Sequence, residues 1–113
     1  MKNSEFAQII CNESYLLLKD VRPSAYIYPV STQNIKWLNS NLSDDIKYKI
    51  DTYMPDKIWL YRHKSVGLLI DSLSKLDYDA REVLMGLLLG YSVEQEDKWL
   101  QYVYEHKEDY IYD

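Results

Sequence analysis

The sequence predicts a mainly helical protein: a compact bundle of five to six helices around a buried central helix at 78–89. Three observations support this fold class. In most segments, apolar residues recur at the three- and four-residue spacing of one helix face. Residues that typically cap helix N-termini precede several of these segments. With only three glycines and three prolines there is little chain for flexible linkers, so residues 1–113 are expected to form a single compact domain.

The first helix is expected near residues 4–20. Ser4 is a suitable N-cap, and Glu5 follows in the first turn, where a carboxylate interacts favourably with the helix dipole. Arg22–Pro23 ends the segment, because the residue before a proline avoids the α conformation. One face of this helix carries Ala7, Ile10, Cys11, Ser14, Leu17, Leu18 and Val21.

Two short segments could pair as a minor two-stranded β ribbon. Residues 25–28 begin the stretch AYIYPV, which Pro29 restricts to an edge strand or an extended segment. Residues 57–61 begin the stretch KIWLYRH, which suits either a strand or the first turns of the following helix. The triplet Arg62–His63–Lys64 falls where a continuous helix would need an apolar residue, and this favours the strand.

Two short helices are expected between these segments. Ser31 or Thr32 would cap the first, whose apolar side carries Ile35, Leu38 and Leu42. The second would begin at Ser43–Asp44–Asp45 and stop at Pro55. A strand is the alternative for this second segment, because Ile46, Tyr48 and Ile50 also alternate. The acidic cap favours the helix.

Two further helices follow, the first capped by Ser65 and the second by Asp77 or Asp79. The helix at 78–89 is apolar on nearly all sides, which is typical of a buried helix. Gly86 lies inside it, at a cost of about 1 kcal/mol relative to alanine. We therefore expect a neighbouring helix to approach closely at Gly86.

The last helix is expected to run from Ser92 toward Lys107. Gly90 suits the end of the preceding helix, and Ser92 with Gln95 forms a capping box. The core face carries Trp99, Leu100 and Val103, and the polar face carries Glu94, Gln95, Asp97, Lys98, Gln101 and Glu105. Residues 108–113 lie beyond the clear periodicity and are expected to form a tail.

The sequence indicates a soluble cytoplasmic protein. The only cysteine, Cys11, cannot form an intramolecular disulfide, and its apolar neighbours suggest a buried, inert thiol. The segment 1–10 lacks the apolar core of a signal peptide. The longest strongly apolar run, 83–90, is far shorter than the roughly 20 residues that cross a bilayer.

Negative charge is concentrated in the last third of the chain. From Asp71 onward there are four basic and eleven acidic residues, a net charge of −7, whereas residues 1–57 are balanced with seven of each. This distribution argues against nucleic acid or a membrane as a ligand of that region, because phosphate binding relies on lysine and arginine. It favours a protein partner with a basic surface, or serves solubility alone.

The residue types give little support for an enzyme. There is no nucleophile-elbow or glycine-rich phosphate motif, and Ser92 is better used as a helix cap. His63 and His106 lie too far apart in sequence for a local zinc motif. The adjacent carboxylate pairs fall in caps, exposed faces or the tail. We therefore expect no catalytic residue, no metal and no cofactor, and a small metal-dependent hydrolase using His106 remains the least supported alternative.

The aromatic content suggests a contact surface. Twelve tyrosines and three tryptophans accompany a single phenylalanine, and tyrosine and tryptophan are enriched at protein interfaces. We therefore predict a non-enzymatic protein-binding module, an inhibitor or immunity-type (anti-defence or antitoxin-like) factor. It would bind a basic, nucleic-acid-handling protein, with DNA mimicry as one version. The predicted partner-binding residues are Tyr91, Glu94, Asp97, Tyr102, Tyr104, Glu105, Glu108, Asp109, Tyr110 and Tyr112.

The main alternative is a structural or assembly component in which the tyrosines form a homodimer interface. In that case the carboxylates would only keep the protein soluble. A homodimer that hides the tyrosines would leave no surface for another partner.

Overall fold

The computed structural model describes residues 1–106, which form five α-helices, a short 3₁₀ helix and a three-stranded antiparallel sheet. This predominance of helix confirms the prediction that the protein is mainly helical. In chain order the elements are α1 (Asn3–Leu18), β1 (Ser24–Ile27), α2 (Thr32–Asn41), β2 (Lys47–Ile50), β3 (Ile58–Tyr61), α3 (Lys64–Ser72), η1 (Leu73–Lys75), α4 (Tyr78–Leu88) and α5 (Val93–Glu105). Within residues 1–106, none of these helices combines the length and apolarity needed to cross a bilayer.

The sheet has β3 at its centre, with β1 on one side and β2 on the other. Leu60 lies opposite both Ala25 of β1 and Tyr48 of β2, which sets the register of the two antiparallel pairs. All four residues of β3 are buried. When both faces of a sheet are covered, a central strand is apolar at every position, as Ile58–Tyr61 is.

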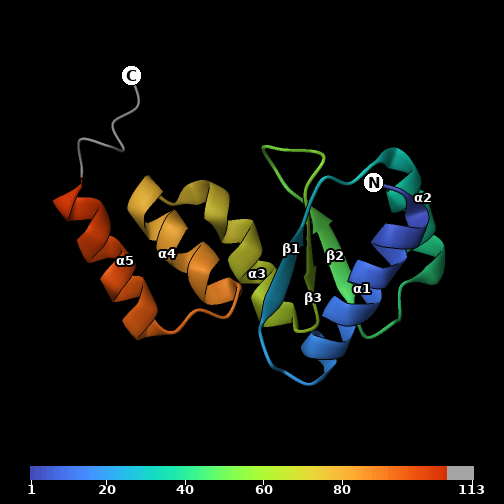
Figure 1. Ribbon diagram of the computed structural model, residues 1–113, viewed down its shortest axis with the longest axis horizontal. Helices are drawn as coiled ribbons and strands as arrows, with labels where there is room; N and C mark the ends of the chain where they lie inside the picture. Colours follow the sequence, from blue (N-terminus) through green and yellow to red (C-terminus); the bar gives the residue numbers. More distant parts are fainter. Residues whose placement is uncertain (107–113) are drawn as a thin grey trace.

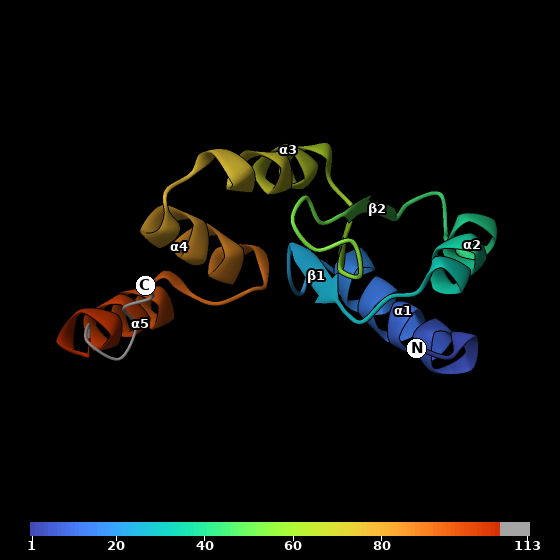
Figure 2. The same cartoon turned by 90° about the horizontal axis from the view of Figure 1, so that it is seen from above.

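Helices cover both faces of the sheet (Figures 1 and 2). Alternate residues of β3 face opposite sides. Ile58 and Leu60 pack with α1 and α2 in one hydrophobic core, which also contains Phe6, Ile10, Leu17, Ala25, Ile27, Val30, Leu38 and Ile46. Trp59 and Tyr61 pack in a second core with Val66, Ile70, Leu73 and Leu88.

A buried hydrogen bond ties α4 to the sheet. The Ser24 hydroxyl, in β1, donates to the backbone carbonyl of Leu88 at the end of α4, with an oxygen–oxygen distance of 2.6 Å. Both residues are almost fully buried. This bond fixes the position of the helix pair α4–α5, which extends away from the sheet at one end of an elongated molecule (Figure 1).

The prediction of a bundle around a buried helix at 78–89 is wrong. In α4 only Gly86 and Leu88 are buried, and the rest of its apolar residues are partly exposed. The most buried element is instead the central strand β3. A helix that is apolar all round can be buried inside a bundle, but α4 divides its sides among α3, α5 and the edge of the second core.

The predicted helix between Asp44 and Pro55 is also wrong, and its alternative is observed. Residues 47–50 form β2, so the expected two-stranded ribbon becomes a three-stranded sheet. Ser43 does not cap a helix, because its carbonyl accepts from the Ile46 N–H in a turn. Pairing with β3 accompanies the strand conformation of this segment. In this conformation, the Lys49 ammonium group lies 2.9 Å from the Asp71 carboxylate of α3.

Helix boundaries agree in part with the expected caps. Ser31 caps α2 and Asp77 caps α4, as predicted. Lys2 and His63, rather than Ser4 and Ser65, occupy the N-cap positions of α1 and α3, and neither makes a side-chain capping bond. Cap preference is a local effect of about 1 kcal/mol, so packing of the helix can shift its start by a residue or two.

Cys11 is exposed, and the prediction of a buried thiol is therefore wrong. The buried side of α1 is centred on Phe6, Ile10 and Leu17. Cys11 follows Ile10 by one residue, which is a rotation of about 100° around the helix axis. That rotation carries its thiol out of the core.

Candidate functional site

The turn that separates α5 from α4 and the cap that begins α5 are both formed as predicted. Gly90 has a φ of 96°, a conformation that non-glycine residues rarely adopt, and it ends α4 in a tight turn. Ser92 then caps α5: its hydroxyl accepts from the Gln95 N–H, and the Gln95 side chain accepts from the Ser92 N–H. The helix runs back along α4, which provides its principal packing surface (Figure 1).

Six of the ten predicted partner-binding residues lie in the described part of the chain, and all six are exposed. Their exposed fractions are 55% for Tyr91, 45% for Tyr102 and 62% for Tyr104, and the carboxylate residues are Glu94, Asp97 and Glu105. The remaining four, Glu108, Asp109, Tyr110 and Tyr112, lie outside the described residues.

These six residues do not share one face of α5. Successive helical residues are about 100° apart, so Tyr102 and Tyr104 lie on opposite flanks of the helix. On one flank, Tyr102 stacks between Trp99 and His106, with ring centroids 5.9 Å and 4.2 Å apart. On the other, the Tyr104 hydroxyl donates to Asp79 of α4 at 3.0 Å.

The outer face of α5 between these flanks is acidic. Glu94 and Glu105 lie there, and Lys98 pairs with Glu94 at 3.4 Å. Both members of that pair are more than three-quarters exposed, so the pair is worth little and leaves the negative charge accessible. Residues 77–106 carry seven acidic and two basic side chains, which makes this end of the molecule strongly negative.

The hydroxyl of Tyr104 also responds to the charge around it. Its hydrogen bond to the Asp79 carboxylate raises the pKa of the Tyr104 phenol, because losing the proton would place two negative charges side by side. Tyr104 thus remains a neutral donor. It links the end of α5 to the start of α4.

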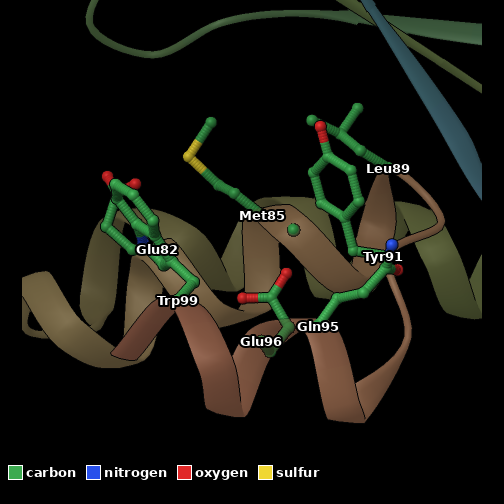
Figure 3. Close-up of a pocket in the computed structure, with 8 residues that line it drawn as sticks. Glu82, Met85, Leu89, Tyr91, Gln95, Glu96 and Trp99 are labelled. Carbon is green, nitrogen blue, oxygen red and sulfur yellow. The ribbon is translucent and has the colours of Figure 1, made fainter. Parts of the chain in front are cut away.

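A pocket between α4 and α5 was not foreseen from the sequence (Figure 3). Its volume is about 440 Å³, and it is walled by Glu82, Met85, Gly86, Leu89, Tyr91, Gln95, Glu96 and Trp99. The size falls within the range of roughly 300–1,000 Å³ that is typical of ligand sites. Among the six partner-binding residues in the described part of the chain, only Tyr91 lines the pocket.

Glu96 lies at the base of this pocket and is only 5% exposed. Figure 3 shows its carboxylate pointing from α5 toward α4, beneath Met85 and between Tyr91 and Trp99. It occupies the space where another residue would have a Cβ at Gly86, so a methyl group there would overlap the carboxylate. The predicted close approach at Gly86 is therefore confirmed, and the group that approaches is a buried acid.

The environment of Glu96 disfavours its charge. Burial is the main effect that raises the pKa of this carboxyl, and the negative charge of Glu82 adds to it. Within residues 1–106, the Glu96 side chain accepts no hydrogen bond and forms no ion pair. Among the described residues, no lysine or arginine lines the pocket.

The sequence did contain a signal for this pocket. Glu96 precedes Trp99, Leu100 and Val103 by three, four and seven residues, which is the spacing of one helix face. A carboxylate on the apolar side of a helix, opposite a glycine in the neighbouring helix, indicates a buried acid.

Two residues of the basic triplet at 62–64 contact Asp20. Asp20 accepts from His63 at 2.8 Å and lies 3.5 Å from the Arg62 guanidinium. The hydrogen bond from His63 is the main reason why the pKa of Asp20 is lowered. These residues join the end of α1 to the start of α3.

Within residues 1–106, no three His, Cys, Asp or Glu side chains lie together in a way that could hold a metal ion. Comparisons with protein families, with curated proteins and with solved structures found no match to this chain.

Proposed function

We propose that this protein is a small non-enzymatic protein-binding module of the cytoplasm. In this role it is an inhibitor or immunity-type factor, anti-defence or antitoxin-like, whose partner is a basic protein that handles nucleic acid. The contact surface is the exposed side of α5 and the preceding turn. The observation that carries the proposal is the combination of accessible aromatic rings and uncompensated carboxylates on one protruding helix.

Two physical arguments support this surface. Tyrosine and tryptophan bury a large area at a low cost in side-chain entropy and keep a polar group for water or a partner. Carboxylates around them attract a basic surface over several ångströms and exclude an acidic one. Trp99 and Tyr102, whose rings stack on one flank of α5, have exposed fractions of 43% and 45%. Neighbouring exposed apolar side chains of this kind are typical of interaction sites.

DNA mimicry is the version of this proposal in which carboxylates replace phosphates. It requires strong electrostatic attraction, because a nucleic-acid-binding site is built to neutralise phosphate charge. Affinity for the partner should then fall steeply as salt is raised from low to physiological concentrations and beyond. An affinity that is constant over this range would exclude mimicry while leaving a less charged contact possible.

The experiment is affinity capture from the native cells with three immobilised proteins. One is the wild type, and one has the α5 acids neutralised by Glu94→Gln, Asp97→Asn and Glu105→Gln. The matched control neutralises three exposed acids at the far end of the molecule, Glu5, Asp44 and Asp45. We expect the wild type and the control to retain the same basic protein, identified by mass spectrometry, and the α5 variant to lose it. Equal capture by all three would refute the proposal.

A homodimer is the second candidate, because the same exposed apolar residues of α5 could pair with those of a second copy. Sedimentation equilibrium separates the two candidates. A dimer that dissociates on Trp99→Ser or Tyr102→Ser would assign this flank to self-association. A monomer at all concentrations would exclude self-association through this flank.

A further inference from the structure

The pocket between α4 and α5 contains a largely buried carboxyl group, Glu96, whose oxygens open toward the pocket and meet no donor of residues 1–106. Glu96 is nine-tenths buried, is aimed into the pocket and has no hydrogen-bond donor within residues 1–106. Burying a carboxylate without a partner is costly, and proteins rarely keep one unless a cation or a ligand completes it. The pocket therefore lacks a positively charged hydrogen-bond donor.

The second carboxylate makes this requirement stronger. Glu82 lines the same pocket from α4, and its charge opposes that of Glu96. A single cation placed between them would relieve the repulsion and satisfy both groups. No lysine or arginine of residues 1–106 lines the pocket, so the described part of the chain supplies no such cation.

The other walls show which cation fits. Trp99 and Tyr91 stand at the two ends of the pocket, with Met85 above the carboxylate and Leu89 behind Tyr91 (Figure 3). These side chains suit a long hydrocarbon stem and a flat cationic head. A guanidinium is planar, stacks on aromatic rings and donates two parallel hydrogen bonds to one carboxylate. An ammonium group is more strongly hydrated and cannot make this paired contact.

We propose that this pocket binds an arginine side chain of the partner protein, with its guanidinium on Glu96 and its stem between Tyr91 and Trp99. The source of the arginine rests on the proposed function, since a basic, nucleic-acid-handling partner carries such residues on its surface. Binding of the guanidinium itself rests only on the pocket. The exposed ladder of Trp99, Tyr102 and His106 continues from the pocket along α5 and extends the contact beyond the inserted side chain.

This proposal connects the two surfaces of α5. The acidic outer face attracts a basic partner at long range, and the pocket then fixes its position through one buried arginine. A central anchor in a desolvated pocket, surrounded by weaker polar contacts, is the usual distribution of energy in a protein interface. Glu96 is then the residue whose removal reduces affinity most, although it is the least exposed acid of α5.

The test uses short peptides as probes and does not require the partner. Acetylated and amidated Gly-Arg-Gly is titrated into the isotope-labelled full chain, and amide shifts are followed by NMR. Gly-Lys-Gly and the citrulline peptide, which is neutral but nearly the same shape as arginine, serve as comparisons. We expect saturable shifts centred on Gly86, Glu96 and the Trp99 indole, with arginine binding several-fold tighter than lysine and the citrulline peptide not binding. Equal shifts with arginine and citrulline would overturn the proposal.

Two variants test the residues. Glu96→Gln keeps the shape and removes the charge, and it should weaken binding of the arginine peptide about tenfold or more, since it replaces a charge-assisted contact with a neutral one. Glu5→Gln, which changes an exposed acid in the first turn of α1, is the matched control and should change it less than twofold. Because Glu96→Gln also removes a buried charge, this variant should fold. Trp99→Leu removes the stacking ring and should weaken binding of the arginine peptide independently of Glu96. Equal effects of the two glutamine variants would refute the role of Glu96.

Agmatine, a free guanidinium compound, distinguishes a small-molecule site from a protein contact. If agmatine binds much more tightly than the peptide, the pocket serves a free metabolite and the assignment to a protein side chain is wrong. If the arginine peptide fails to bind while capture from cells still depends on the α5 acids, the pocket proposal fails and the proposed function stands. If the peptide binds through Glu96 but capture is equal for all three immobilised proteins, the pocket proposal stands and the proposed function fails.

Discussion

Replacing Ser24 with alanine should loosen the attachment of α4 to the sheet. The Ser24 hydroxyl donates to the Leu88 carbonyl at 2.6 Å, and the exposed fractions of the two residues are 0% and 2%. The Ser92 N–H, which would be the helical partner of that carbonyl, donates instead to Gln95. The variant therefore loses a buried hydrogen bond and leaves a carbonyl with no other donor in the described structure.

The size of the effect follows from these contacts. A lost hydrogen bond costs about 1 kcal/mol, and a buried carbonyl left without a donor raises the total to about 2 kcal/mol. The entropy of unfolding is about 2.1 cal/mol/K per residue, which gives about 0.24 kcal/mol/K for 113 residues. Dividing the free energy by this entropy predicts that the melting temperature falls by about 8 °C.

Thermal unfolding followed by circular dichroism, with urea titration as a second measure, tests this prediction. Ser40→Ala is the matched control, because Ser40 is exposed and its hydroxyl makes only a long contact of 3.4 Å within α2. That variant should change stability by less than about 0.5 kcal/mol. If Ser24→Ala melts within about 2 °C of the wild type, or no lower than Ser40→Ala, the buried bond does not hold α4 to the sheet.

Three further predictions concern the α4–α5 end of the molecule. Because the pKa of Glu96 is raised, the folded protein binds more protons than the unfolded chain between the ordinary and raised values, and stability falls as pH rises through this window. Glu96→Gln should remove that loss. The urea midpoint of the variant should therefore exceed that of the wild type by an amount that grows from about pH 4 to about pH 8, and a difference that stays constant would contradict this. Gly90→Ala should destabilise the protein by about 1–2 kcal/mol, because φ is 96° at this position, and an unchanged urea midpoint would disprove it. Asp79→Asn should lower the pKa of Tyr104, measured as the difference in phenolate absorbance against Tyr104→Phe, and an unaltered titration would exclude their hydrogen bond.

Local signals predicted the elements whose conformation depends on nearby residues. The capping box at Ser92, the cap at Asp77 and the turn at Gly90 each involve groups within a few positions of one another, so the sequence contains their whole cause. The exposure of Tyr91, Tyr102 and Tyr104 also agrees with a helix that has only one packed side. These parts of the candidate surface could be predicted without a structure.

The conformation of residues 47–50 and the burial of Glu96 depend on tertiary contacts, so the sequence alone did not predict them. The short stretch 47–50 suits a helix or a strand by its own preferences, and hydrogen bonding to β3 decided between them. The burial of Glu96 depends on Gly86, ten residues away, which leaves room for a carboxylate between two helices. A hydrophobic pattern shows which side of a helix is apolar, but it does not show what lies opposite.

By itself, the sequence determined that the chain is mainly helical, where α5 begins and that its exposed surface carries acids and aromatic rings. Only the tertiary structure decided that β3, not the helix at 78–89, forms the centre, and that α4 and α5 enclose a pocket around a charge. The physical reason is the range of the interactions. Caps, turns and helix periodicity act within one or two turns, whereas burial results from surfaces brought together across the whole chain.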